Sequence, residues 1–230
     1  MKRSEINNHL RDAAAFIKGM NFCLPPFAFW SPEDWLGKGP EYDEIRDNML
    51  GWDLTDFGSG NYLQVGLLLF TLRNGNLKNS HYIKPYAEKL MLVREGQVTP
   101  LHFHTHKMED IINRGGGNLL VEVYNAALDD QLDKTRVSVT MDGRTFTVTA
   151  GTVLKLTPGE SISLPTRQYH RFWGEQGSGM VLAGEVSQVN DDTTDNHFLE
   201  PAGRFPRIEA DEKPCFLLCN EYPPAHLQKV

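Results

Sequence analysis

The chain has 230 residues, 40% of them hydrophobic and 23% charged, which is typical of a globular protein with room for one large domain. Its net charge of -7 argues against binding to nucleic acid or to an anionic membrane, because both require a basic surface. Three cysteines do not make a disulfide framework, and without a signal peptide or an apolar run of about 18 residues we expect a cytoplasmic protein that does not span a membrane.

The N-terminal part of the chain predicts helices followed by irregular structure. Apolar residues recur at helical spacing from Ile6 to Met20, and Ser4 is the expected N-cap of this first helix. Ser31, followed by a proline and two acidic residues, predicts the start of a second helix. Residues 37–61 are rich in Gly, Asp and Asn, which predicts irregular structure.

Residues 62–230 predict a single domain built of short strands. Apolar and alternating runs are separated by turns with Gly and Pro, which is typical of a sandwich or barrel. The clearest local pattern is a hairpin with a two-residue turn at Asp142-Gly143. Residues 1–61 then form an extension packed on this domain, because they are too few to hold much core of their own. The predicted strands cover residues 65–72, which form an apolar run buried on both faces, and residues 118–124, 137–141, 144–148, 152–156, 161–164 and 180–186.

Two histidines and a glutamate form a candidate metal site in the stretch His102-Phe103-His104 and Glu109. Alternate side chains of an extended strand share a face, so the two imidazoles point the same way. A short turn can return the carboxylate of Glu109 to the same point. Two imidazoles and a carboxylate are a common ligand set for Mn, Fe, Ni, Co or Zn. A lone His-x-His pair is more often structural, because a metal site needs three or four convergent ligands.

A second stretch supplies a candidate fourth ligand. Further along the chain, a turn at Gly159, a short strand and Pro165 bring His170 to the end of a strand. Together with the first three groups, this histidine makes a complete ligand set for one divalent ion.

Both stretches resemble the paired sequence motifs of the cupins. Arg167 and Gly174 depart from the second motif, at positions that are not metal ligands in that family. The resemblance implies a mainly β fold, the cupin β-barrel or jelly-roll, with the N-terminal helical extension packed on it. The matching positions are Gly96, His102, His104, Glu109 and Gly116 for the first motif and Gly159, Pro165 and His170 for the second.

The resemblance narrows to the bacterial D-lyxose isomerases, a cupin family of sugar isomerases. Residues 107–117, residues 184–196 and the helical extension before the barrel carry it, and it covers nearly the whole chain. The resemblance implies Mn²⁺-dependent interconversion of D-lyxose and D-xylulose, with D-mannose to D-fructose as a side activity. It also implies a homodimer.

This chemistry requires groups beyond the metal ligands. Aldose–ketose isomerisation moves a proton between adjacent carbons, and a divalent ion stabilises the charge that develops on the enediolate. A group that is not a ligand must carry the proton. Glu185 is the candidate general base, with an edge-strand surface carboxylate as the alternative. Lys107 is a candidate hydrogen-bond donor to a sugar oxygen, with a solvated loop lysine as the alternative. Lys89, Gln97 and Arg204 are candidates for binding sugar hydroxyls.

Two other histidines and two aromatic residues lie near these positions. We expect His106 to be diverted from the metal by the turn before the glutamate ligand, and to be exposed or to support a ligand. His197 is expected at the surface, with the pocket mouth as the alternative. Phe172 and Trp173 are expected in the barrel core, with an aromatic wall against the sugar as the alternative.

Three other functions compete with the isomerase. An Fe²⁺-dependent cupin dioxygenase would use similar ligands but needs redox-active iron and a position for O₂. An isomerase of phosphorylated sugars would need a dense patch of Lys and Arg, whereas the basic residues here are scattered. A cupin that only binds sugar would have no need for a complete set of metal ligands.

Overall fold

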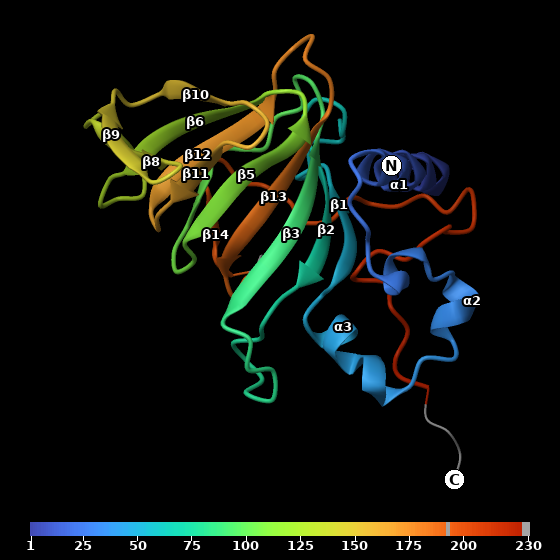
Figure 1. The fold of residues 1–230 in the computed structure, drawn as a ribbon. Coiled ribbons are helices and arrows are strands. Elements are labelled where there is room, and N and C mark those ends of the chain that lie inside the picture. The colour runs from blue at the N-terminus through green and yellow to red at the C-terminus, as the bar shows by residue number, and fades with distance from the viewer. Residues whose placement is uncertain (192–193, 227–230) are drawn as a thin grey trace.

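The computed structural model describes residues 1–191 and 194–226, and it contains two curved antiparallel sheets with helices beside one of them (Figure 1). The larger sheet has the strand order β1-β2-β3-β13-β5-β11-β8-β9. The smaller sheet has the order β10-β6-β12-β4-β14, and β7 pairs with β6. The strands are β1 (Gly51–Thr55), β2 (Leu67–Arg73), β3 (Tyr86–Val93), β4 (His102–His104), β5 (Glu109–Gly116), β6 (Leu119–Ala126), β7 (Leu132–Asp133), β8 (Val137–Met141), β9 (Arg144–Val148), β10 (Thr152–Leu156), β11 (Ser161–Leu164), β12 (Gln168–Gly174), β13 (Val181–Gln188) and β14 (Asn196–Phe198).

The apolar side chains of strand β2 are divided between two hydrophobic cores. Leu67 and Leu69 belong to the core inside the barrel, while Leu68 and Phe70 belong to a second core that includes residues of the first helix. This split follows from the alternation of side chains along a strand. The strand is therefore buried on both faces, as its continuous apolar run predicts.

Helix α1 (Arg3–Gly19) lies beside β1 and β2 and completes this second core (Figure 1). The expectation that Ser4 caps it was wrong, because the helix begins at Arg3 and its N-cap is Lys2. The backbone N–H of Arg3 donates to the Glu209 carbonyl, and the Ser4 hydroxyl donates to Asp211 Oδ2 at 2.7 Å. Pairing with this distant segment therefore fixes where the helix starts.

The other helices are short. Ser31 caps α2 as predicted, since its hydroxyl accepts the Asp34 N–H at 3.1 Å. No helix within the described ranges is long and apolar enough to cross a membrane. The short helices are η1 (Pro26–Phe29), α2 (Pro32–Trp35), η2 (Pro40–Tyr42) and α3 (Asp43–Asp47).

Residues 37–61 contain more structure than their composition predicts. They hold η2, α3 and β1, so the expectation of irregular structure was wrong there. β1 pairs with β2 along its whole length, with Asp53 opposite Leu69, and thus extends the larger barrel sheet. A strand that precedes residue 61, the predicted boundary, therefore belongs to the barrel.

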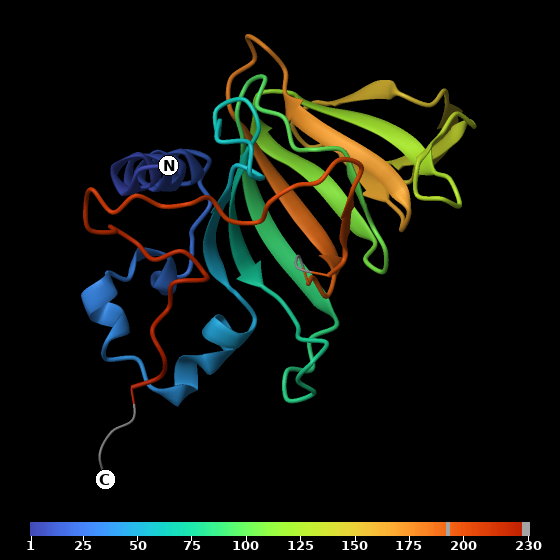
Figure 2. The same ribbon diagram turned by 180° about the vertical axis from the view of Figure 1, so that it is seen from behind.

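The chain after β14 passes the barrel and then runs back along the helices (Figure 2). There Arg3 forms an ion pair with Glu221, and the Asn7 side chain donates to the Lys213 carbonyl at 2.8 Å. The same segment also pairs with β1, since Leu218 bridges to Trp52 and the Cys219 N–H donates to the Trp52 carbonyl, so it connects the helices to the larger sheet.

Candidate metal centre and active site

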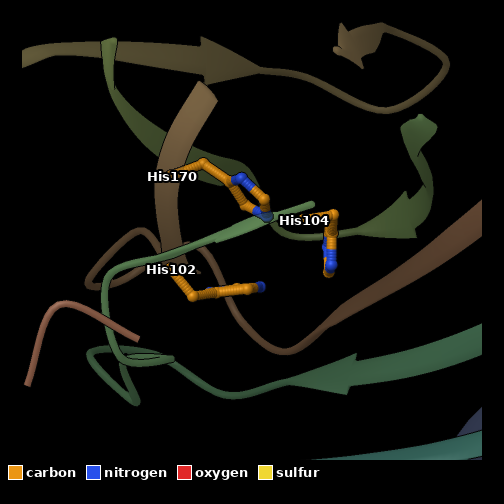
Figure 3. A group of neighbouring side chains, drawn as sticks. All are labelled: His102, His104 and His170. Atoms are coloured by element: carbon orange, nitrogen blue, oxygen red, sulfur yellow. The ribbon is translucent and has the colours of Figure 1, made fainter. Parts of the chain in front are cut away.

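Strands β4 and β12 bring three histidines together. The two strands are antiparallel and place His102 opposite His170, and alternation along β4 turns His104 to the same side as His102. One ring nitrogen from each histidine lies within 4.8 Å of the others. Figure 3 shows the three rings converging on one space. Phe103, between the first two, points to the other side and stacks on His197 with ring centroids 4.6 Å apart.

Backbone carbonyls orient two of the rings. His102 Nδ1 lies 2.8 Å from the Pro100 oxygen, and His170 Nδ1 lies 3.1 Å from the Gln168 oxygen. Because a carbonyl can only accept, each Nδ1 carries the hydrogen and each Nε2 presents its lone pair. Partners of this kind are typical of metal-binding histidines. Removal from water and the neighbouring imidazoles of His170 and His104 lower the pKa of His102 well below its usual value, which favours the neutral, ligating form.

The carboxylate of Glu109, at the start of β5, faces the same space. Its Oε1 lies 3.1 Å from His170 Nε2, and its Oε2 lies 3.2 Å from His104 Nε2 and 2.7 Å from Lys107 Nζ. Burial alone would raise the pKa of Glu109. The positive charge of Lys107 outweighs burial and holds this pKa well below its usual range. Glu109 is therefore ionised.

These four groups fit a divalent cation. His170 Nε2 is buried and has no hydrogen-bond partner among the described residues, although a carboxylate oxygen lies 3.1 Å away. A lone pair facing a carboxylate at this distance is unfavourable unless a cation is shared between them. Neutral imidazoles and an ionised carboxylate are suitable donors for such an ion. The structure thus brings together the four residues that the sequence predicts as ligands.

A buried group of charges adjoins the ligands. Lys107 Nζ donates to Glu185 Oε1 at 2.8 Å, and Lys89 Nζ lies 3.6 Å from the same oxygen. The Ser187 hydroxyl donates to it at 3.0 Å. β13 lies between β3 and β5, and Glu185 and Lys107 are only 5% and 2% exposed. The alternatives of an edge-strand carboxylate and a solvated lysine are therefore wrong.

Asp195, which sequence reasoning did not single out, supports the ligands from the segment before β14. Its Oδ1 accepts the His106 N–H at 2.7 Å, and its Oδ2 accepts the Lys107 N–H at 3.1 Å and lies 3.8 Å from His104 Nδ1. His106 itself is exposed. Asp195 thus holds the turn between His104 and Glu109. Only its position two residues before His197 hinted at a place near the pocket.

A cavity of about 60 Å³ lies over the ligands and the buried charges. Lys89, Lys107, Glu185 and Arg204 line it, so four of the five candidate catalytic and sugar-binding residues share this space. Gln97 is outside it: this side chain is buried and donates to the Tyr62 carbonyl. The structure therefore gives Gln97 a position that supports the fold and not a place in the cavity wall.

The remaining aromatic residues lie either inside the barrel or on its outer side. Phe172 lies in the barrel core, as predicted, and it also lines the cavity, as the alternative of an aromatic wall requires. Trp173 is only half-buried and lies under the Arg171 guanidinium, so its expected place in the core was wrong. Strand alternation explains the difference, since neighbours in β12 face opposite sides. His197 is half-buried on the outer side of β4, away from the cavity.

Three kinds of similarity connect this chain to known proteins. Residues 1–222 match the family model described as D-lyxose isomerase. The D-lyxose/D-mannose isomerases of Serratia proteamaculans and Escherichia coli O157:H7 are 53% and 52% identical, over 96% of this chain and 98% of each relative. The solved structure of L-ribose isomerase from Cellulomonas parahominis has a TM-score of 0.62 at 15% identity, over 91% of this chain and 98% of that one. At this identity the last similarity bears on the fold alone.

Proposed function

Because this chain belongs to the D-lyxose isomerase family, we propose that it interconverts D-lyxose and D-xylulose, with D-mannose and D-fructose as a second pair. The chain is a sugar isomerase that acts on aldoses and ketoses. Family membership favours this function over the dioxygenase and the sugar-binding module. The observation that carries the chemistry is the position of Glu185, a buried carboxylate that shares the cavity with His102, His104 and Glu109 but is not one of the candidate ligands.

The ion would be held by His102, His104, Glu109 and His170, and we propose Mn²⁺. When bound, a divalent ion supplies positive charge that stabilises negative charge on the sugar oxygens. Oxygen-rich substrates and open coordination positions suit Mn²⁺ better than a closed tetrahedral zinc site.

The residues beside the ligands supply the proton chemistry. In the aldose-to-ketose direction, Glu185 takes the proton from C2 and returns it to C1, while the O2 proton passes to O1. Lys107 donates to Glu185 and orients its carboxylate, and it is placed to donate to a sugar oxygen as charge builds there. Ser187 holds the carboxylate from the other side. Lys89 and Arg204 line the same cavity and are proposed to bind sugar hydroxyls.

The cavity wall argues against phosphorylated substrates. Arg204 is the one arginine that lines it within the described part of the chain, so the cavity lacks a dense patch of Lys and Arg. Lys107 and Lys89 are engaged by Glu185. A phosphate group usually requires several uncommitted donors. Neutral sugars therefore fit better.

The test is to incubate Mn²⁺-loaded protein with a panel of pentoses, hexoses and their phosphates without oxygen, and to detect the ketose. D-lyxose should react fastest, D-mannose more slowly and sugar phosphates poorly. Faster turnover of D-fructose 6-phosphate, or turnover that depends on iron and O₂, would contradict the proposal. A homodimer in the cytoplasm is also proposed, and light scattering of the purified protein checks its mass against 26.0 kDa per chain.

A further inference from the structure

A second cavity lies beside the one that holds the metal ligands. Its volume is about 250 Å³, against about 60 Å³ for the first, and Arg204 lines both. Polar groups from four parts of the chain surround it, among them Asp53 of β1, Thr71 of β2, Asn74 and Asn190. Its wall therefore offers many hydrogen-bonding groups, as a site for a polyhydroxylated molecule requires.

The first cavity offers little room for a whole sugar, since its volume is about a quarter of that of the second. It can take the reacting end of an open-chain sugar next to the ligands. The other end needs further space.

A row of inward-facing residues leads from the first cavity to the second. In the larger sheet Glu185 lies opposite Lys89, and Lys89 lies opposite Thr71, on adjacent strands. Glu185 and Lys89 line the first cavity, and Thr71 lines the second. Two strand spacings, about 10 Å, separate the ends of this row. The two cavities are thus neighbours on the same face of one sheet.

The ion pair between Arg204 and Asp53 stands where the cavities meet. The Asp53 side chain is 3% exposed and lies on a strand, whereas the Arg204 side chain is 28% exposed and lies in a segment without helix or strand. The arginine is therefore the partner that can move. Arg204 lines both cavities and Asp53 lines the second, so a movement of this arginine would alter the space between them.

Two residues that line the second cavity each have a buried acceptor without a hydrogen-bond partner. Within residues 1–191 and 194–226, neither Asp53 Oδ1 nor Asn190 Oδ1 receives a hydrogen bond. The backbone of Asn190 is already fixed, since its N–H donates to Asn74 Oδ1 at 3.0 Å and its carbonyl accepts from Asn74 Nδ2 at 2.9 Å. Buried acceptors that are held in place without a donor are matched by the hydroxyl groups of a ligand or by water.

We propose that the second cavity is the subsite for the distal hydroxyl groups of the open-chain sugar, and that Arg204 swings away from Asp53 to admit them. Asp53 then accepts a hydrogen bond from a distal hydroxyl of either sugar, and Asn190 accepts one from the hydroxyl on the carbon that only the hexose carries. This inference rests on the proposed function. It explains how one site can accept both a pentose and a hexose, because the added carbon of the hexose extends into the larger cavity.

The Asn190→Leu variant tests this proposal, because it removes an acceptor with little change in volume and leaves the backbone pair with Asn74 in place. We expect the ratio of kcat/KM for D-mannose to kcat/KM for D-lyxose to fall about tenfold, the effect of one lost hydrogen bond. Asn118→Leu is the matched control: Asn118 lines neither cavity and donates to Glu175. Its ratio should stay within about twofold of wild type, and Asn190→Asp should restore the ratio. An unchanged ratio in Asn190→Leu would overturn the subsite.

Binding of the alditols obtained by reducing D-mannose and D-lyxose separates this inference from the proposed function, because alditols cannot be isomerised. Calorimetry should show that Asn190→Leu weakens the hexitol about tenfold more than the pentitol. Equal weakening, or no binding to wild type, would overturn the subsite even if both sugars were isomerised. Absence of isomerisation with normal alditol binding would instead refute the proposed function.

A crystal structure of the wild-type protein with the hexitol keeps the test independent of any variant. A distal hydroxyl should lie within about 3.2 Å of Asp53 Oδ1 or Asn190 Oδ1, with Arg204 turned away from Asp53. A bound hexitol that leaves the ion pair closed and the second cavity to water alone would contradict the proposal.

Discussion

The contacts of Glu185 allow the effect of replacing it on stability and turnover to be estimated. In the Glu185→Gln variant the side-chain oxygen can still accept hydrogen bonds from Lys107 and Ser187, which lie 2.8 and 3.0 Å from it in the wild type. The side chain should therefore keep its place. Because the ion pair becomes a hydrogen bond from an ammonium to a neutral amide, and Glu109 still lies 2.7 Å from Lys107 Nζ, we expect the free energy of unfolding to fall by only about 1 kcal/mol.

Catalysis should suffer far more than stability. The amide cannot take a proton from carbon, and loss of a general base lowers turnover by about 100-fold or more, or roughly 2.7 kcal/mol in the barrier. Metal content and sugar binding should remain, because Glu185 is not among the four candidate ligands. The matched control is Glu88→Gln, on the neighbouring strand, where the carboxylate pairs with Arg73 outside the cavity.

The assay combines turnover of D-lyxose with proton NMR of the product formed in D₂O. A carboxylate that exchanges its proton with solvent leaves deuterium at C1 of the ketose, and the variant should slow this exchange along with turnover. Wild-type turnover in Glu185→Gln would move the role to another group, with Lys107 tested next. Product without deuterium would instead favour a hydride shift.

Three further perturbations follow from the contacts described. His104→Ala should remove the roughly one divalent ion per chain expected of a complete ligand set, together with activity, and elemental analysis that finds the metal retained would contradict the site. Asp195→Asn should lower metal affinity by about 10–100-fold with little change in the fold, as measured by titration with a competing chelator; an unchanged affinity would show that the contacts to the His106 and Lys107 amides do not matter. Leu10→Ala should lower the free energy of unfolding by about 2–5 kcal/mol in denaturant titrations, because this side chain is fully buried against the larger sheet; a loss below about 1 kcal/mol would mean that α1 contributes little.

The convergence of the candidate ligands His102, His104 and Glu109 was predictable because its geometry is local. His102 and His104 share a face by alternation, and the turns before Glu109 and His170 are short. Strand β3 was not predicted, since adjacent charges at Glu88 and Lys89 interrupt its apolar pattern. In the fold these two face opposite sides, one to Arg73 outside and one to the buried Glu185 inside.

Contacts between distant segments could not be read from local patterns. Asp195 reaches the metal centre from a part of the chain 89 residues beyond His106. Gln97 directly follows Gly96 of the first motif, but its side chain donates to the Tyr62 carbonyl outside the cavity. This position was not predicted, because nothing in the sequence fixes which side of the loop the side chain occupies. Asp53 lies in a stretch whose composition predicts irregular structure, and only pairing with β2 makes it part of a barrel wall.

The C-terminal segment that runs back over the helices has a consequence for how the molecule assembles. Arg3 and Glu221, which hold α1 in place, are 218 residues apart in the chain. During synthesis on the ribosome α1 can form early, but its polar partners emerge only after the whole barrel. Contacts of such long sequence separation slow folding, because a long loop must close before they contribute. The helices that come first in the chain should thus be among the last parts to acquire native protection from hydrogen exchange.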